Sequence, residues 1–100
     1  MALLDLRCPV PSDGAHRLAW AIALANDPAA LIARIEAAVG VNTVDRLLNG
    51  SLVPGERMGA ALWEATRGAV NVRQFYRRTP LRWWQAPAGI AVPQRAKRAA

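Results

Sequence analysis

Few side chains in this sequence could carry catalysis or bind a metal ion. His16 is the only histidine and Cys8 the only cysteine, so the sequence supplies neither a multi-thiolate metal site nor a histidine-centred catalytic dyad. No phosphate-binding glycine loop, nucleophile elbow or carboxylate pair is recognisable in it. We therefore expect no enzymatic activity, no cofactor and no metal, and we expect His16, close to a helix start, to be solvated or hydrogen-bonded locally.

The side chains with binding chemistry are the arginines, which are unevenly distributed. Residues 1–72 carry six Arg against seven acidic residues, net −1, whereas residues 73–100 carry six Arg and one Lys with no acid, net +7. Such a basic segment suits a polyanion, because each phosphate that it neutralises releases counterions. The alternative is a solvated tail that binds nothing. The candidate phosphate contacts in this segment are Arg73, Arg77, Arg78 and Arg82.

The elements that must position these residues are helical. The chain has 100 residues, 53% hydrophobic and 20% charged, so we expect one small domain with one core. Because much of the apolar content is alanine, the core is thin, and dimerisation or a docked tail would bury further surface. The larger residues that must supply the packing are Leu18, Trp20, Leu31, Leu47, Leu62, Trp63 and Phe75.

Capping and helix-breaking residues divide the chain into five short helical segments, and no alternating strand pattern is seen. Ser12 or Asp13 can cap the first segment, and Asp27 followed by Pro28 begins the second. Thr79-Pro80 stops the last. The sequence therefore predicts an all-α fold with an irregular basic tail and with helices at about 13–25, 28–39, 42–48, 55–66 and 71–78.

The second and third segments have the spacing of a helix-turn-helix, in which a supporting helix and a tight turn hold a recognition helix. Asn42 can cap the recognition helix, with Asp45 three residues later, and Asn49-Gly50 closes it. Val44, Leu47 and Leu48 are expected to face inward. The other positions that would lock the pair of helices are Ala33 and Ala37 at the crossing and Val39 in the turn.

The stretch from Thr43 to Tyr76, TVDRLLNGSLVPGERMGAALWEATRGAVNVRQFY, contains three strings with a known counterpart. They are Leu48-Asn49-Gly50, Val53-Pro54-Gly55-Glu56-Arg57 and Glu64-Ala65-Thr66-Arg67-Gly68-Ala69-Val70. Over about residues 28–76 the chain resembles the Cro-like regulators of the YdaS family, which are found in prophages. The resemblance implies a lambda-repressor-like fold of five helices that binds double-stranded operator DNA, usually as a homodimer.

The resemblance also implies which residues meet the DNA. Arg46 is the main one, because an exposed Arg on a recognition helix can make a bidentate contact to guanine. The alternative is that Arg46 pairs with Asp45 or Glu36, or is only solvated. Asp45 can accept from a cytosine amino group, and Arg57 can contact a phosphate or else form a surface ion pair. The full set of expected DNA-binding residues is Asn42, Thr43, Asp45, Arg46, Asn49, Ser51 and Arg57.

Trp83 and Trp84 lie beyond the resemblance, and two adjacent tryptophans are too large to remain uncovered without a reason. We favour docking on the helical core or a dimer interface; stacking on unpaired bases and docking on a partner protein are the alternatives. Trp20 and Trp63 lie within helices and are expected in the core or at its edge. The domain organisation that follows is a DNA-binding domain over residues 1–78 and an extension over residues 79–100.

These features favour a transcriptional regulator, a Cro-like repressor of phage or prophage type, that acts on operator DNA. One alternative is a phage-encoded inhibitor or adaptor that binds a host protein through Trp83, Trp84 and the tail. Another is an antitoxin that represses its own promoter and binds a toxin. Residues 1–11 do not look like a secretory signal, and no long apolar span occurs. We therefore expect no membrane partner and a cytoplasmic location in a bacterial or phage-infected cell.

Overall fold

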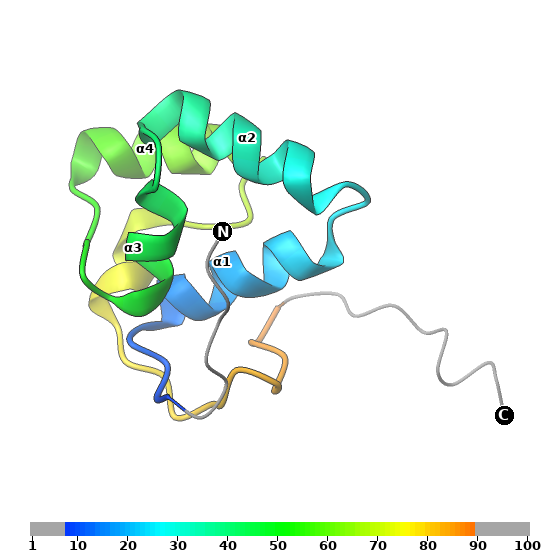
Figure 1. Ribbon diagram of the computed structural model, residues 1–100. Helices are drawn as coiled ribbons and strands as arrows, with labels where there is room; N and C mark the ends of the chain where they lie inside the picture. Colours follow the sequence, from blue (N-terminus) through cyan, green and yellow to red (C-terminus); the bar gives the residue numbers. More distant parts are fainter. Residues whose placement is uncertain (1–7, 90–100) are drawn as a thin grey trace, which may run out of the picture.

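The computed structural model describes residues 8–89, which form four α-helices and one 3-10 helix and contain no strand (Figure 1). The all-α prediction is confirmed, but the fifth segment is a 3-10 helix and not the α-helix that was expected. No helix in this part of the chain is both long and apolar enough to cross a membrane. The elements are α1 (Asp13–Leu24), α2 (Pro28–Val39), α3 (Thr43–Asn49), α4 (Glu56–Ala65) and η1 (Val72–Tyr76).

Side-chain caps begin three of these elements where the sequence predicts them. The Ser12 hydroxyl accepts from the Ala15 amide at 3.0 Å, and the Asp27 carboxylate accepts from the Ala30 amide at 3.1 Å. At η1, Asn71 and Gln74 form a reciprocal capping box. These bonds satisfy amide groups that have no partner inside the helix, and thereby fix where each element starts.

The core lies between α1 on one side and the pair α2 and α4 on the other, and α3 closes one end (Figure 1). The prediction that Leu18, Leu31, Leu47, Leu62 and Phe75 are buried is confirmed. Trp20 is half-buried. The expectation for Trp63 was wrong, because its side chain is 48% exposed on the outer side of α4. The buried cluster is Leu18, Ile22, Leu31, Ile35, Val44, Leu47, Leu48, Leu62, Ala65, Val70 and Phe75.

Two glycines let η1 approach the helices on both of its sides. A Cβ atom on Gly14 of α1 would lie 2.5 Å from the Phe75 ring, and one on Gly59 of α4 would lie 2.4 Å from the Val72 Cβ atom. Both distances are far below van der Waals contact, so no larger residue fits without moving η1. The short 3-10 helix is therefore wedged between α1 and α4.

Residues 77–89, which we call the strap, fold back onto α1. The Asp13 amide donates to the Arg77 carbonyl at 2.9 Å, and the Trp20 indole N–H donates to the Trp83 carbonyl at 2.8 Å. The Asp13 carboxylate also accepts from the guanidinium groups of Arg17 and Arg77, each at 3.0 Å. These bonds join the start and the middle of α1 to a segment more than sixty residues away in sequence.

The strap covers His16. The Trp83 side chain is 5% exposed and meets the His16 ring edge to face, with ring centroids 6.1 Å apart. His16 itself is 0% exposed, and neither of its ring nitrogens has a hydrogen-bond partner among residues 8–89. The expectation of a solvated or locally bonded His16 was therefore wrong, because the strap closes over it.

Candidate nucleic-acid interface

Residues 40–42 form the turn between α2 and α3. Asn42 occupies the N-cap position of α3, but its side chain makes no capping hydrogen bond. Its backbone is left-handed, with φ of 66°. Its amide instead donates to the Glu36 carboxylate at 3.2 Å. The Thr43 hydroxyl donates to the Val39 carbonyl, also at 3.2 Å, so the turn is held by Thr43 and not by the predicted Asn42 cap.

This arrangement changes which residues of the helix pair face outward. Thr43 was expected to contact DNA, but its side chain is 5% exposed because its hydroxyl donates to the Val39 carbonyl of α2. Ala33 and Ala37 are exposed, so the expectation that they form the helix crossing was wrong. Ile35, which lies between them in sequence, is fully buried, and α2 presents this side chain and that of Leu31 to the core.

The inner face of α3 is as predicted, since Val44, Leu47 and Leu48 are all buried. On the outer face Arg46 and Asn49 are exposed, and Asp45 is half-buried. Three apolar side chains therefore anchor a helix of seven residues and fix the direction in which its polar residues point.

The Arg46 side chain forms no hydrogen bond or ion pair with any other residue in the range 8–89. The proposed alternative partner Glu36 is already used, because its carboxylate accepts from the Asn42 amide. Arg46 is instead anchored through its backbone: its carbonyl accepts from the Leu52 amide at 3.1 Å. The guanidinium group is thus held out from a fixed position with its donors available for an external acceptor.

The turn after α3 brings two more predicted residues to the same place. The Asn49 side-chain oxygen accepts from the Ser51 amide at 2.8 Å, which leaves the Asn49 NH₂ group as the donor that points outward. The Ser51 hydroxyl is exposed and lies 3.5 Å from the Arg46 carbonyl. Arg46, Asn49 and Ser51 therefore form one polar surface at the C-terminal end of α3.

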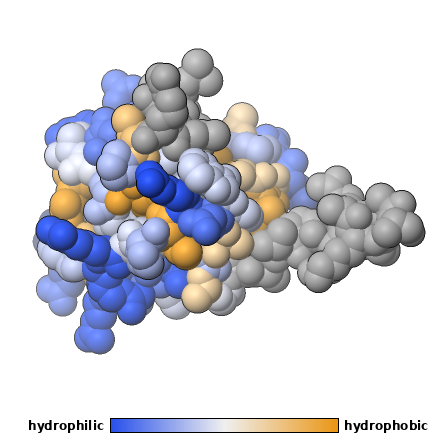
Figure 2. All heavy atoms as spheres, turned by 90° about the horizontal axis from the view of Figure 1, so that it is seen from below, coloured by the Kyte–Doolittle hydropathy of each residue, from blue (hydrophilic) through white to orange (hydrophobic). Residues whose placement is uncertain are grey.

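Basic residues of the strap begin beside this surface. The Tyr76 hydroxyl donates to the Pro54 carbonyl at 3.0 Å, which ties the end of η1 to the loop between α3 and α4. Figure 2 views the molecule from below, and strongly hydrophilic residues gather on the side where η1 and this loop lie in Figure 1. The exposed arginines of this part of the chain are Arg73, Arg77, Arg78 and Arg82.

Two of the predicted phosphate contacts, Arg57 and Arg77, differ in whether the guanidinium group already forms an ion pair within residues 8–89. Arg57 is exposed in the first turn of α4, where the cap Gly55 provides no side-chain bond. Arg77 is held by its ion pair with Asp13, although its side chain remains largely exposed. The structure places Tyr76, just before the strap, against the loop after α3, and it places Arg77 against Asp13 of α1. Asn42 lies at the opposite end of α3.

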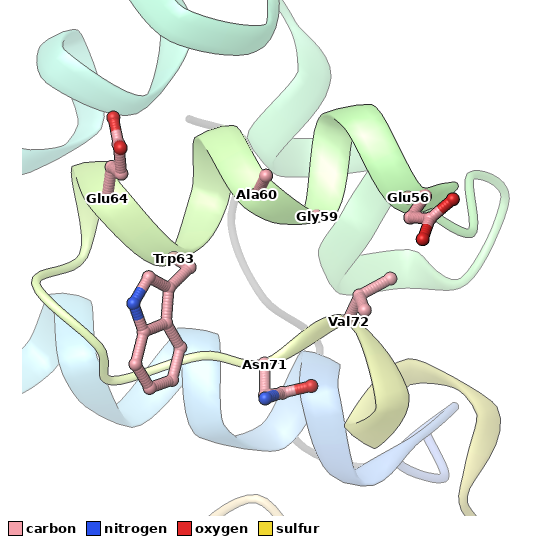
Figure 3. A pocket seen from close by; sticks show the side chains of 7 residues that line it. All are labelled: Glu56, Gly59, Ala60, Trp63, Glu64, Asn71 and Val72. Atoms are coloured by element: carbon pink, nitrogen blue, oxygen red, sulfur yellow. The ribbon is translucent and has the colours of Figure 1, made fainter.

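A groove that was not predicted from the sequence runs between α4 and the segment leading into η1 (Figure 3). It has a volume of about 400 Å³, and the exposed Trp63 indole lies along it toward Asn71. The one signal for it in the sequence was Trp63, which we had expected in the core or at its edge. Its lining residues are Glu56, Gly59, Ala60, Trp63, Glu64, Asn71 and Val72.

Residues 8–89 contain no group of three or more His, Cys, Asp or Glu side chains that could hold a metal ion. No family model matches the chain, no curated protein is significantly similar to it, and no solved structure matches its fold significantly. The resemblance to the YdaS regulators therefore stays a prediction, and the candidate interface rests on the geometry of α3 and the residues around it.

Proposed function

We propose that this protein is a sequence-specific DNA-binding regulator of transcription, acting as a Cro-like repressor on operator DNA in the cytoplasm of a bacterial or phage-infected cell. The proposal rests on α3, which is fixed to the core on one side and presents an arginine on the other. Its inner face is locked by Val44, Leu47 and Leu48, while Arg46 projects with no partner among the described residues. A rigid helix with an available arginine is what direct reading of a guanine in the major groove requires.

Neighbouring residues support the same role. Asn49 presents an NH₂ donor and Ser51 an exposed hydroxyl beside Arg46, and both groups can bond to base edges or phosphates. Arg57 and the strap arginines supply positive charge for the DNA backbone. Thr43 is left out of the reading surface, because its hydroxyl is engaged with Val39.

The proposed regulator binds as a homodimer. A domain with one short recognition helix reads only a few base pairs, so a second copy is needed to specify an operator. Two copies related by a two-fold axis would protect a symmetric site with half-sites about 10 base pairs apart. A single asymmetric footprint would rule out this arrangement.

The test is a fluorescence-anisotropy titration of the full chain against its own upstream intergenic DNA and against a scrambled duplex of equal length. Titrations are done at two salt concentrations, because phosphate contacts weaken steeply with salt whereas discrimination between sequences persists. We expect tighter binding to the upstream DNA at both concentrations. Equal binding to the two duplexes that disappears at the higher salt would contradict the proposal.

One observation favours a second candidate, a protein-binding adaptor or antitoxin. Trp84 is 61% exposed next to the exposed Arg82, and Trp and Arg are frequent anchors of protein interfaces. In this case the partner would be a toxin or a host protein. Trp84→Ala would then abolish the biological effect and leave the anisotropy titration unchanged, whereas a pure regulator would lose nothing.

A further inference from the structure

We propose that the groove between α4 and η1 is the docking site of the chain's own C-terminal segment, residues 90–100, which lies outside the described residues. The inference concerns the free protein and does not rest on the proposed function. It follows from the chemistry of the groove, from the composition of the segment and from the place at which the strap ends.

The centre of the groove is apolar and shallow. Gly59 and Ala60 of α4 and Val72 line it, and the contact of Gly59 with Val72 leaves no room for a deeper floor. The Trp63 indole lies at one end (Figure 3), and a Cβ atom on Gly68 would be 3.3 Å from its ring. One part of the indole is thus backed by the chain, while 48% of the residue remains exposed.

Two glutamates of α4 border this apolar centre, and the carboxylate on the groove side is that of Glu56 (Figure 3). Glu56 lies at the end away from Trp63, and Glu64 lies at the Trp63 end on the other flank of α4 (Figure 3). Both residues are exposed, and neither carboxylate has a hydrogen bond or ion pair within residues 8–89. A groove with an indole at one end and a carboxylate at the other suits a peptide that carries apolar and cationic side chains, because the carboxylate and the ring face both attract cations.

Residues 90–100, IAVPQRAKRAA, have this composition. The segment begins with Ile90 and Val92, contains no acid, and ends with the cations Arg95, Lys97 and Arg98. Its proline cannot continue a helix, so an extended peptide in an open groove is compatible with its sequence. The segment is complementary to the groove in both hydrophobicity and charge.

The strap delivers this segment to the groove. Gly89, its last residue, lines the same cavity as Gly68 and Gln74. Gly68 backs the Trp63 indole, and the Gln74 side chain accepts from the amide of Asn71, a lining residue of the groove, at 2.9 Å. Residues 68–74 therefore contribute to both the cavity at Gly89 and the groove, and eleven residues span up to about 36–40 Å when extended.

The test is paramagnetic broadening in the full chain. A nitroxide is attached at Ala99→Cys in a Cys8→Ser background, since Cys8 is the only native cysteine. The amide of Gly59 and the indole N–H of Trp63 are compared with exposed Ala29 on α2. We expect the two groove signals to lose most of their intensity relative to the reduced label, with Ala29 little affected.

Matched variants distinguish the outcomes. Glu56→Gln with Glu64→Gln should restore most of the lost intensity, whereas Glu36→Gln, which removes an equal kind of charge on α2, should not. Broadening that is uniform over the domain, or undiminished in the double variant, would overturn the proposal. A second control mixes spin-labelled chain without ¹⁵N with unlabelled ¹⁵N-enriched chain. Broadening seen only in this mixture would also overturn the proposal, because the occupant of the groove would then be a second copy. No DNA is present, so the result is independent of the anisotropy titration.

Discussion

Arg46 is available to an external partner because its neighbours satisfy one another. Glu36, the nearest carboxylate that the sequence offered from α2, accepts from the Asn42 amide, and the turn after α3 bonds to the Arg46 carbonyl and not to its guanidinium group. The backbone of the residue is thus fixed and its head group is left to solvent. A residue whose backbone is already fixed loses less conformational freedom on binding than one on a mobile segment.

Replacing Arg46 with Ala should therefore weaken operator binding selectively. We expect Arg46→Ala to cost about 1–3 kcal/mol of binding free energy, a roughly 5- to 150-fold rise in Kd for the upstream duplex, with little change for the scrambled duplex. The control is Arg67→Asn, which removes a positive charge beyond the far end of α4 at a residue with φ of 54°, a conformation that Asn tolerates. Equal losses in the two variants would mean that only net charge matters.

The sequence alone predicted whether some residues are buried or exposed, but not others. Val44, Leu47 and Leu48 were predictable, because apolar side chains at helical spacing must share a face. Thr43 and Trp63 were not. The hydroxyl of Thr43 is buried because a backbone carbonyl happens to lie within reach, and Trp63 is exposed because α4 turns that side away from the core. Both outcomes depend on how helices are placed in space.

At the scale of elements, the boundaries followed from capping chemistry. Ser12, Asp27 and Asn71 each accept from a backbone amide at the start of an element, so the starts were predictable to within a residue or two. The type of η1 was not, because a segment of five residues is too short for its periodicity to separate an α-helix from a 3-10 helix. Its geometry is set by the space between α1 and α4.

The close packing of η1 against α1 leads to a prediction for Gly14. Alanine normally favours a helix over glycine by about 0.8–1.0 kcal/mol, but here the new Cβ atom would lie 2.5 Å from the Phe75 ring and 2.8 Å from the Phe75 backbone nitrogen. Overpacking should prevail, so we expect Gly14→Ala to lower the free energy of unfolding by about 1–2 kcal/mol, measured by urea denaturation. In Gly55→Ala nothing lies within 4 Å of the new atom, so overpacking is absent, and the poorer preference of alanine for the N-cap position costs about 0.5–1 kcal/mol. A stabilised Gly14→Ala would show that η1 can move away.

At the scale of the whole molecule, the strap belongs to the folded structure. The sequence indicated that Trp83 or Trp84 needs covering, but adjacent residues of an irregular segment could not be assigned to inside or outside. In the structure Trp83 fills the site over His16, and Trp84 projects outward. Residues 82–85 form a turn that is closed by a hydrogen bond from the Gln85 amide to the Arg82 carbonyl at 3.0 Å. This turn decides which of the two indoles is buried.

The two tryptophans therefore form a matched pair for testing the strap. We expect Trp83→Ala to destabilise the protein by about 3–5 kcal/mol, the usual cost of removing a buried aromatic side chain. We expect Trp84→Ala to change stability by about 0.5 kcal/mol or less, as is typical of exposed positions. Thermal denaturation followed by circular dichroism measures both. Similar, small effects would show that the strap contributes no stability to the helical core.

The closure of α1 by the strap also bears on the order in which the fold can form as the chain is made. Of the described helices α1 is synthesised first, yet the acceptors for the Asp13 amide and the Trp20 indole are the carbonyls of Arg77 and Trp83. Until those residues have been synthesised, the face of α1 that carries His16 is open to water and to chaperones. Long-range closure of this kind delays completion of the fold, so the first of the described helices to be synthesised is among the last to have its contacts completed.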